Sequence, residues 1–335
     1  MKKNCKIIAE VAQAHDGSFG IAKSFIDAVS EAGADVIKFQ THFANEETTH
    51  REPWRVKFSE QDMSRFDYWK RMEFSEDQWF ELKNHSTKKG LKFMSSPFSN
   101  KAVDLLKKID VYAWKIASGE IANSELLDKI AETGRRVYLS TGMSTIKEID
   151  LAVENIKKRN MPLTIMQCTS MYPTPPEKIG INIIEFYKQR YKCSVGLSDH
   201  SSNIFTGIAA LVKGITALEV HVTFDKRMFG PDASSSLTIE ELKKLVDGVR
   251  FVEKILNSDV DKDLIANELK PIKTIFSKSI VYNQDYKKNT QITRSKLSFK
   301  KPGDGINPSK ISEVIGKKLI KDVKADDMVL KKDLK

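Results

Sequence analysis

The chain alternates short apolar runs with longer segments of helical periodicity. Eight runs rich in Val, Ile, Leu and Phe are typical of buried strands, from KIIAEV at residues 6–11 to ALEVHVT at residues 217–223. Between most of them the apolar residues follow the period of a helix, as in SELLDKIAETG. Eight strands alternating with eight helices over about 255 residues predict an α/β fold, the (β/α)8 TIM barrel. A doubly wound sheet is the alternative, but no glycine-rich phosphate-binding sequence follows the first strand.

The pattern changes near Ser258, which predicts a domain boundary. Residues 1–257 hold the predicted barrel, and residues 258–276 resemble a linker with short helical pieces. Residues 277–335 contain short strands separated by turn signals, which predicts a small β-rich domain. A domain of roughly 60 residues is near the lower size at which a chain keeps a core of its own.

A long interval, residues 41–73, separates the second predicted strand from the next helix. It contains Trp54, Arg55, Tyr68 and Trp69, and is too aromatic for a disordered segment. Long loops in compact domains usually serve a function. The interval therefore predicts a lid over a site or a contact with another subunit.

Composition and charge narrow the classes of protein. Hydrophobic residues make up 40% of the chain, which is enough for a sizeable core. We expect no secretory leader, because the apolar run in the first residues breaks at Glu10. No run approaches the roughly 20 apolar residues of a membrane-spanning helix, so we expect a cytoplasmic protein without a membrane partner. The net charge is +10, but residues 271–335 hold 16 Lys and Arg against 7 Asp and Glu, which accounts for +9. These charges are scattered and lack an RNA-binding motif, so we expect no nucleic-acid partner.

Polar side chains recur where the predicted strands end, the face on which TIM barrels carry their active sites. Side chains alternate along a strand, so Lys38 and Gln40 share one side while Ile37 and Phe39 point to the other. Charged residues inside strand after strand predict an active site. The inward positions, with those just beyond them, are Glu10, Lys38, Gln40, Ser95, Ser96, Lys115, Ser118, Glu120, Ser140, Thr141, Thr169, Ser170, Ser198, His200 and His221, with Tyr172 on a loop.

The cationic members of this set are Lys38 and Lys115. Together with nearby serine hydroxyls they suit a phosphate or carboxylate ligand. The competing interpretation is that each lysine forms a structural ion pair, with Glu10 or with Glu120. Glu120 itself is a candidate for proton transfer or for orienting a water molecule.

The two histidines at matching strand ends, His200 and His221, suggest a divalent metal site that polarises a substrate carbonyl. The competing interpretation is a pair of hydrogen-bonded core histidines. The other four histidines, at positions 15, 42, 50 and 85, lack such placement.

Nine stretches of the sequence, taken together and in order, resemble the N-acetylneuraminate (sialic acid) synthase family. The tail KKPGDGI…IGKKL resembles that family's antifreeze-like (SAF) domain, a small β-rich module. The resemblance therefore covers nearly the whole chain. The nine stretches are IIAEVAQAHDG, GADVIKFQT, SSPFS, KIASGE, LSTGM, QCTSMYPTPPE, GLSDHS, EVHVTFD and GPDASSSL.

The resemblance implies a transferase that condenses phosphoenolpyruvate with an N-acylated hexosamine aldehyde, giving a nine-carbon 2-keto acid and phosphate. The acceptor would be N-acetylmannosamine or a 2,4-diacetamido-trideoxyhexose. The family uses a divalent metal, Mn²⁺ first with Mg²⁺ or Co²⁺ as alternatives, and forms domain-swapped homodimers. The implied roles are catalysis for Glu10, Glu120, Lys38 and Lys115; phosphoenolpyruvate binding for Lys38, Gln40, Ser96, Lys115, Ser118, Ser140 and Ser170; sugar binding for Tyr172, Asp232 and Lys301; and metal binding for His200 and His221.

Three positions depart from the family's pattern. Ala14 stands where an asparagine is usual, and Val220 replaces a basic residue between Glu219 and His221. Lys301 stands where the family commonly has an arginine that contacts the sugar's N-acyl group in the partner's active site. A lysine cannot reproduce the bidentate fork of a guanidinium. The type of sugar product, whether neuraminate, legionaminate or pseudaminate, therefore stays open.

Two other functions compete with this interpretation. One is a barrel aldolase that forms a Schiff base through Lys115, which borohydride trapping would reveal and metal dependence would contradict. The other is a carbohydrate- or polyanion-binding protein with an inactive barrel. Heparin retention that survives removal of residues 271–335 would exclude the tail as the binder.

Overall fold

The computed structural model describes residues 4–335 and divides into two compact units, the first ending at Asn257 and the second running from Ser258 to Lys335. The first unit is a closed barrel of parallel strands in sequence order. Closure is set by β1, whose Ile8 pairs with Val36 of β2 and with Glu219 of β8. The predicted TIM barrel is therefore confirmed, and the alternative of a doubly wound sheet is excluded. The strands are β1 (Lys6–Glu10), β2 (Val36–Thr41), β3 (Lys92–Pro97), β4 (Trp114–Ile116), β5 (Val137–Ser140), β6 (Leu163–Cys168), β7 (Ser194–Asp199) and β8 (Ala217–Thr223), and the short β9 (Leu237–Thr238) pairs with β8.

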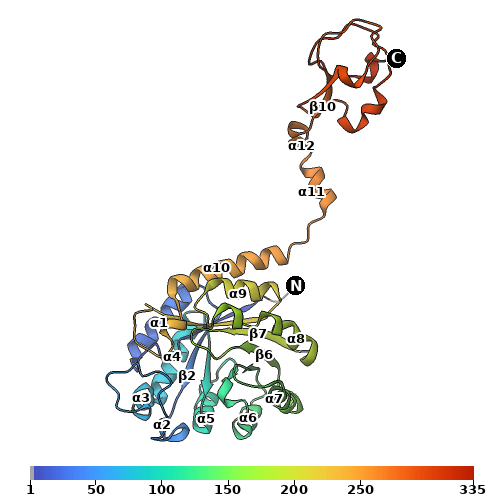
Figure 1. Cartoon of the computed structure of the whole chain (residues 1–335). Coiled ribbons are helices and arrows are strands. Elements are labelled where there is room, and N and C mark those ends of the chain that lie inside the picture. The colour runs from blue at the N-terminus through green and yellow to red at the C-terminus, as the bar shows by residue number, and fades with distance from the viewer. Residues whose placement is uncertain (1–3) are drawn as a thin grey trace. The chain divides into compact units, whose positions relative to one another are not determined.

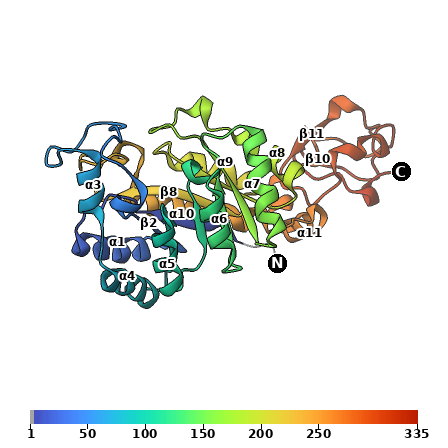
Figure 2. The same ribbon diagram turned by 90° about the horizontal axis from the view of Figure 1, so that it is seen from below.

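The helices of this unit lie outside the strands (Figures 1 and 2). Side-chain caps fix where several begin: Thr145 and Thr238 each form a reciprocal capping box with the glutamate three residues further on. Gly33 and Gly214, with φ of 84° and 76°, reverse the chain between a helix and the next strand. The helices around the barrel are α1 (Phe19–Glu31), α4 (Glu76–Lys88), α5 (Asn100–Lys108), α6 (Ser124–Ala131), α7 (Ile146–Lys158), α8 (Ile181–Tyr191), α9 (Ile204–Val212) and α10 (Ile239–Leu256).

The barrel interior is apolar at one level and polar at the next. A buried cluster of Ile8, Val36, Met94, Ala113, Tyr138, Met166 and Ala217 fills the lower level. Because alternate residues of a strand share a face, the residue two positions further along each strand points into the same interior, nearer the carboxyl end. The apolar cluster is thus the floor beneath a polar layer. That layer contains Glu10, Lys38, Ser96, Lys115, Ser140, Cys168 and Glu219.

The interval between β2 and α4 is an ordered segment with its own small aromatic core. It contains α2 (Ala44–Glu47) and α3 (Arg65–Met72). Tyr68, Trp69 and Met72 are buried there, with Trp54 and Phe58 packed against the same cluster. This packing explains how a segment with so little regular structure holds side chains in fixed positions.

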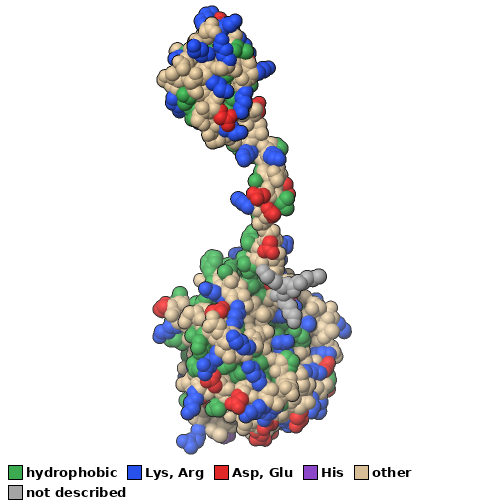
Figure 3. Space-filling model, turned by 90° about the vertical axis from the view of Figure 1, so that its right-hand side faces the viewer, with side chains coloured by type: hydrophobic (Ala, Val, Ile, Leu, Met, Phe, Trp, Pro, Cys, Tyr) green, Lys and Arg blue, Asp and Glu red, His purple; other side chains and the backbone are tan. Residues whose placement is uncertain are grey.

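The second unit begins with α11 (Lys262–Glu268) and α12 (Lys270–Phe276), followed by the antiparallel pair β10 (Ser279–Tyr282) and β11 (Leu297–Lys300). Its core contains Ile280, Tyr282 and Val329 among other buried residues, so the predicted small β-rich domain is confirmed. Figure 3 shows its Lys and Arg side chains dispersed over the visible surface. Across the part of the chain that is described, no helix is long and apolar enough to cross a membrane.

Candidate active site

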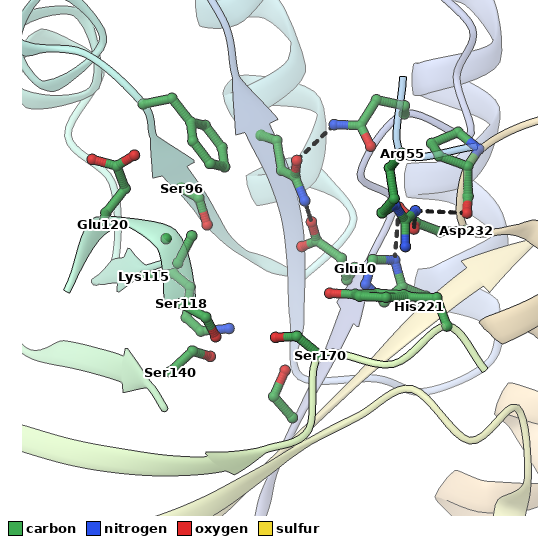
Figure 4. Close-up of a pocket in the computed structure, with 18 of the residues that line it drawn as sticks. Glu10, Arg55, Ser96, Lys115, Ser118, Glu120, Ser140, Ser170, His221 and Asp232 are labelled. Carbon is green, nitrogen blue, oxygen red and sulfur yellow. Dashed lines mark hydrogen bonds and ion pairs between the residues drawn. The ribbon is translucent and has the colours of Figure 1, made fainter. Parts of the chain in front are cut away.

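A cavity of about 440 Å³ lies at the carboxyl ends of the barrel strands. Most residues that the sequence singled out for the site line it. Ser95, Thr141 and Thr169 do not, because neighbouring residues point to opposite sides and the hydroxyls of these three donate to backbone carbonyls. Lys301 follows β11 in the second unit. Figure 4 shows how the side chains converge from different strands. The predicted residues that line the cavity are Glu10, Lys38, Gln40, Ser96, Lys115, Ser118, Glu120, Ser140, Ser170, Tyr172, Ser198, His200, His221 and Asp232.

Two buried lysines and two buried glutamates form the bottom of the cavity. Lys38 Nζ lies 2.5 Å from Glu10 Oε2 and 3.8 Å from Glu219 Oε1, and Lys115 Nζ lies 2.5 Å from Glu219 Oε1. Burial would raise the pKa of Glu219, but the charges of Lys115 and Lys38 outweigh it and lower that pKa to about 2. Glu219 is thus an anion shared by both lysines, and its Oε2 lacks a hydrogen-bond partner among the described residues.

These ion pairs bear on the competing interpretation, in which each lysine forms a structural ion pair with Glu10 or Glu120. Lys38 does pair with Glu10, as that interpretation required. Lys115, however, pairs across the barrel with Glu219, because both residues lie in the same interior layer. Glu120 stands at the start of the loop after β4 instead, where Asn123 Nδ2 donates a hydrogen bond to its Oε2 at 2.8 Å.

A cradle of hydroxyl groups lies beside the lysines. Ser118 Oγ accepts a hydrogen bond from the backbone N–H of Gly142 at 3.0 Å. A Cβ atom at Gly142 would collide with Ser170 Oγ and would lie 2.7 Å from Cys168 Sγ and 2.9 Å from Ser118 Oγ. Only glycine therefore allows these side chains to converge, and Figure 4 shows Ser118 and Ser140 next to Lys115. Hydroxyls and ammonium groups together are donors suited to an oxyanion.

The two histidines lie side by side, with ring centroids 5.3 Å apart. His200 Nδ1 lies 3.0 Å from the carbonyl oxygen of Thr169, which fixes the proton on Nδ1 and leaves Nε2 free. Burial lowers the pKa of His200 to about 3, with a smaller contribution from His221, so the ring is neutral at pH 7. Tyr172 stacks on His200 at 4.2 Å.

This donor set fits a catalytic metal better than a structural one. No cluster of three or more His, Cys, Asp and Glu side chains able to enclose an ion occurs among residues 4–335. Two imidazoles, with Asp232 Oδ2 3.9 Å from His221 Nδ1, would leave coordination positions for substrate and water. The backbone carbonyl that orients His200 is the kind of outer partner that metal-ligating histidines use.

Several cavity residues were missed by the sequence reasoning. Glu219 had a visible signal, since it lies two positions before His221 on the same face of β8. His42, which was expected to have no place in the site, lines the cavity, and its Nε2 lies 3.0 Å from Gln13 Nε2. That expectation was wrong because His42 follows Gln40 by two positions and continues its face just beyond β2.

Arg55 was named from the sequence only as a member of the interval 41–73 and was not assigned to the site. Its Nη2 lies 2.6 Å from Asp232 Oδ1, an ion pair drawn in Figure 4, and its guanidinium lies 4.3 Å from the centre of the Tyr172 ring. It joins the two residues of the barrel expected to bind sugar. No periodicity in residues 41–73 could have located it.

Comparisons with known proteins agree with this geometry. The NeuB family model matches residues 25–261 and the SAF domain model matches residues 277–335. The chain is 33% identical to an N,N'-diacetyllegionaminic acid synthase from Campylobacter jejuni, over 98% of this chain and 99% of that protein. It is 32% identical to the human N-acetylneuraminate-9-phosphate synthase, over 97% and 91%. The crystal structure of an N-acetylneuraminic acid synthetase from Leptospira borgpetersenii, in complex with citrate, superposes with a TM-score of 0.70 at 30% identity, covering 80% of this chain and 91% of that one.

Proposed function

Because the chain belongs to the NeuB family, whose members include synthases of sialic-acid-type sugars, we propose that it condenses phosphoenolpyruvate with the aldehyde of an N-acylated hexosamine. The products are a nine-carbon 2-keto acid and phosphate. One observation carries the proposal: paired buried lysines with a serine cradle adjoin two histidines in a single cavity. The first group suits an anionic donor and the second suits a carbonyl acceptor.

Phosphoenolpyruvate would bind at the bottom of the cavity. Lys38 and Lys115 would attract its phosphate and carboxylate, and Ser118, Ser140 and Ser170 would donate hydrogen bonds. Gln40 and Ser96 line the same part of the cavity, and Ser96 Oγ already lies 3.2 Å from Lys38 Nζ. Because Glu219 serves both lysines, an incoming anion can take over part of its role without leaving either lysine unpaired.

The reaction joins C3 of phosphoenolpyruvate to the aldehyde carbon, and the aldehyde oxygen takes a proton to become a hydroxyl. Water then adds to the cationic C2 and loses a proton, and the tetrahedral intermediate collapses with cleavage of the C2–O bond, releasing phosphate. We assign these proton transfers to Glu120, whose carboxylate lines the cavity, and the positioning of the reacting groups to Glu10, which Gln40 Nε2 holds at 2.9 Å. His200 and His221 would hold a divalent metal, with Mn²⁺ the first candidate, which when bound supplies Lewis acidity toward the aldehyde oxygen.

The aldolase alternative is not favoured by the environment of Lys115. A Schiff-base lysine is usually prepared by an apolar pocket or a neighbouring cation. Lys115 instead lies 2.5 Å from the buried carboxylate of Glu219.

We also propose that the protein acts as a homodimer. The helices α11 and α12 have seven residues each, which is too short for stable isolated helices. Leu264, Ile272, Ile275 and Phe276 on these helices are all exposed within the chain. A second copy would cover them, and light scattering would report a mass twice that of the chain. A monomer at micromolar concentration would refute this part of the proposal.

The experiment that tests the function is consumption of phosphoenolpyruvate with Mn²⁺ and a panel of acceptors. The panel contains N-acetylmannosamine, its 6-phosphate, and the diacetamido-trideoxy sugars of manno and altro configuration. Release of phosphate that requires one of these sugars and stops on adding a chelator would establish the synthase. No release with any acceptor, once bound metal has been verified, would refute the proposal.

A further inference from the structure

The mouth of the cavity is lined by charged side chains from the segment of residues 41–73, and these charges are already paired. Arg65 Nε lies 2.9 Å from Glu52 Oε1, an ion pair whose angle is not that of a hydrogen bond. Arg55 Nη2 lies 2.6 Å from Asp232 Oδ1. His42 Nδ1 lies 2.6 Å from Glu47 Oε1. Each guanidinium that reaches the cavity therefore has a carboxylate partner supplied by this chain.

The net charge of the cavity lining also argues against a site for a second phosphate. Four cationic side chains line the cavity, Lys38, Lys115, Arg55 and Arg65, against six carboxylates, Glu10, Glu47, Glu52, Glu120, Glu219 and Asp232. A divalent cation would balance the excess of two carboxylates, and Lys38 and Lys115 are assigned to phosphoenolpyruvate. The cations that remain in the lining are Arg55 and Arg65, and each already has a carboxylate partner. No cation among the described lining residues is left over for a second phosphate.

The uncharged part of the mouth is aromatic. His42 lies between Trp69 and Phe98, with ring centroids 4.1 and 4.6 Å away and near-parallel planes. The indole N–H of Trp69 is bonded to Glu52 Oε2 at 2.9 Å, and His42 Nδ1 lies 2.6 Å from Glu47 Oε1, so both donors of this wall face carboxylates of the chain. The stack covers the faces of His42, and the Arg65 guanidinium lies 5.0 Å from the centre of the Trp69 ring. The wall therefore offers the C–H edges of stacked rings, which suit the C–H groups and acyl methyls of a sugar and not a phosphate.

We propose that residues 41–73 make this enzyme selective for an uncharged acceptor, an N-acylated hexosamine without a phosphate group. This inference rests on the proposed synthase function. A phosphate at the far end of the sugar would approach Glu47 and Glu52, and like charges brought together at a binding site penalise the wrong ligand. Glu52 is the central residue, because it neutralises Arg65 and also engages Trp69.

The test compares kcat/KM for N-acetylmannosamine with that for N-acetylmannosamine 6-phosphate, which differ only in the phosphate, with the diacetamido-trideoxy sugars as further neutral acceptors. We expect the best neutral acceptor to exceed the 6-phosphate by about 100-fold, which corresponds to roughly two like-charge contacts. The Glu52→Gln variant removes one negative charge and releases Arg65. It should shift the ratio about 10-fold toward the phosphorylated sugar.

The matched control is Glu60→Gln, an exposed carboxylate of the same segment that does not line the cavity. It should leave the ratio of kcat/KM values unchanged. If Glu52→Gln fails to fold, Glu47→Gln removes a different charge of the mouth and carries the same expectation. Ratios are used because they do not depend on the fraction of active enzyme.

The outcomes separate this inference from the function it rests on. Equal or better use of the 6-phosphate by the wild-type enzyme would overturn the selectivity and leave the synthase in place. A ratio that neither Glu52→Gln nor Glu47→Gln changes would overturn the role given to these carboxylates. Failure of every acceptor, neutral or phosphorylated, would overturn the synthase proposal and this inference with it.

Discussion

Glu219 is the single carboxylate on which both cavity lysines depend, so replacing it tests how the bottom of the site is held together. Its Oε1 lies 2.5 Å from Lys115 Nζ and 3.8 Å from Lys38 Nζ, and all three side chains are at most 4% exposed. Glu219→Gln keeps the shape and removes the charge. Glu10 then remains the only carboxylate close to Lys38, and Lys115 loses its only ion-pair partner in the described structure.

Breaking a buried ion pair by removing one partner costs about 3–5 kcal/mol, because a buried charge is left uncompensated. Taking about 3 kcal/mol and a slope of about 2–4 °C per kcal/mol for a domain of this size, the midpoint of thermal unfolding should fall by about 10 °C. The measurement is calorimetry of metal-free protein in the presence of a chelator. Phosphoenolpyruvate should raise the midpoint of the variant more than that of the wild type, because an anionic ligand replaces the missing charge.

The matched control is Glu120→Gln, a carboxylate of the same cavity with no lysine or arginine ion pair in the described structure. It should change the free energy of unfolding by less than about 0.5 kcal/mol. A Glu219→Gln variant as stable as this control would refute the reasoning, since the lysines would then not depend on Glu219. An equal effect of phosphoenolpyruvate on wild type and variant would refute the view that Glu219 occupies the place of a substrate anion.

Three further predictions address other parts of the site. Gly142→Ala places a Cβ 2.7 Å from Cys168 Sγ and 2.9 Å from Ser118 Oγ, so kcat/KM for phosphoenolpyruvate should fall by about 100-fold, while binding of metal, followed by calorimetry, stays as in the wild type. His221→Ala should abolish both turnover and tight Mn²⁺ binding while circular dichroism stays unchanged, and wild-type turnover in this variant would exclude the metal assignment. Lys301→Ala should raise the KM for the sugar more than the KM for phosphoenolpyruvate, and equal changes in the two constants would count against a role of the second unit at the sugar end.

The sequence could predict those parts of the structure that follow from the two-residue period of a strand. Lys38 and Gln40 could be assigned to the interior because Ile37 and Phe39 are apolar, and the structure places them there. The two-residue period does not show which inward residues contact one another across the barrel. Lys115 pairs with Glu219, and not with the nearby Glu120, because closure of the sheet brings β4 and β8 to opposite sides of one narrow interior.

Residues outside the strands were predictable only as a group. The interval 41–73 could be assigned a function from its length and aromatic content, but the positions of Glu52, Arg55 and Arg65 depend on the packing of Tyr68, Trp69 and Met72 beneath them. A loop side chain has no period to fix its direction. The placement of Arg55 against Asp232 follows from contacts between two loops that are far apart in the sequence.

The difference between strand residues and loop residues corresponds to a difference in the chemistry of the groups that they carry. The groups suited to phosphoenolpyruvate, the two lysines and the serine cradle, are carried by or directly follow strands whose positions are fixed by closure of the barrel. The groups that we propose to face the sugar come from the interval 41–73 and the loop that carries Asp232. Loops accept substitution more readily than barrel strands, because fewer buried contacts depend on them. If the strands hold the donor and the loops hold the acceptor, as proposed, then relatives at 33% and 32% identity are expected to differ in acceptor, and the two bear the names of different sugar products. The identity of the acceptor is therefore better sought in the ion pairs of Glu52 and Arg55 than in the strand motifs that identify the family.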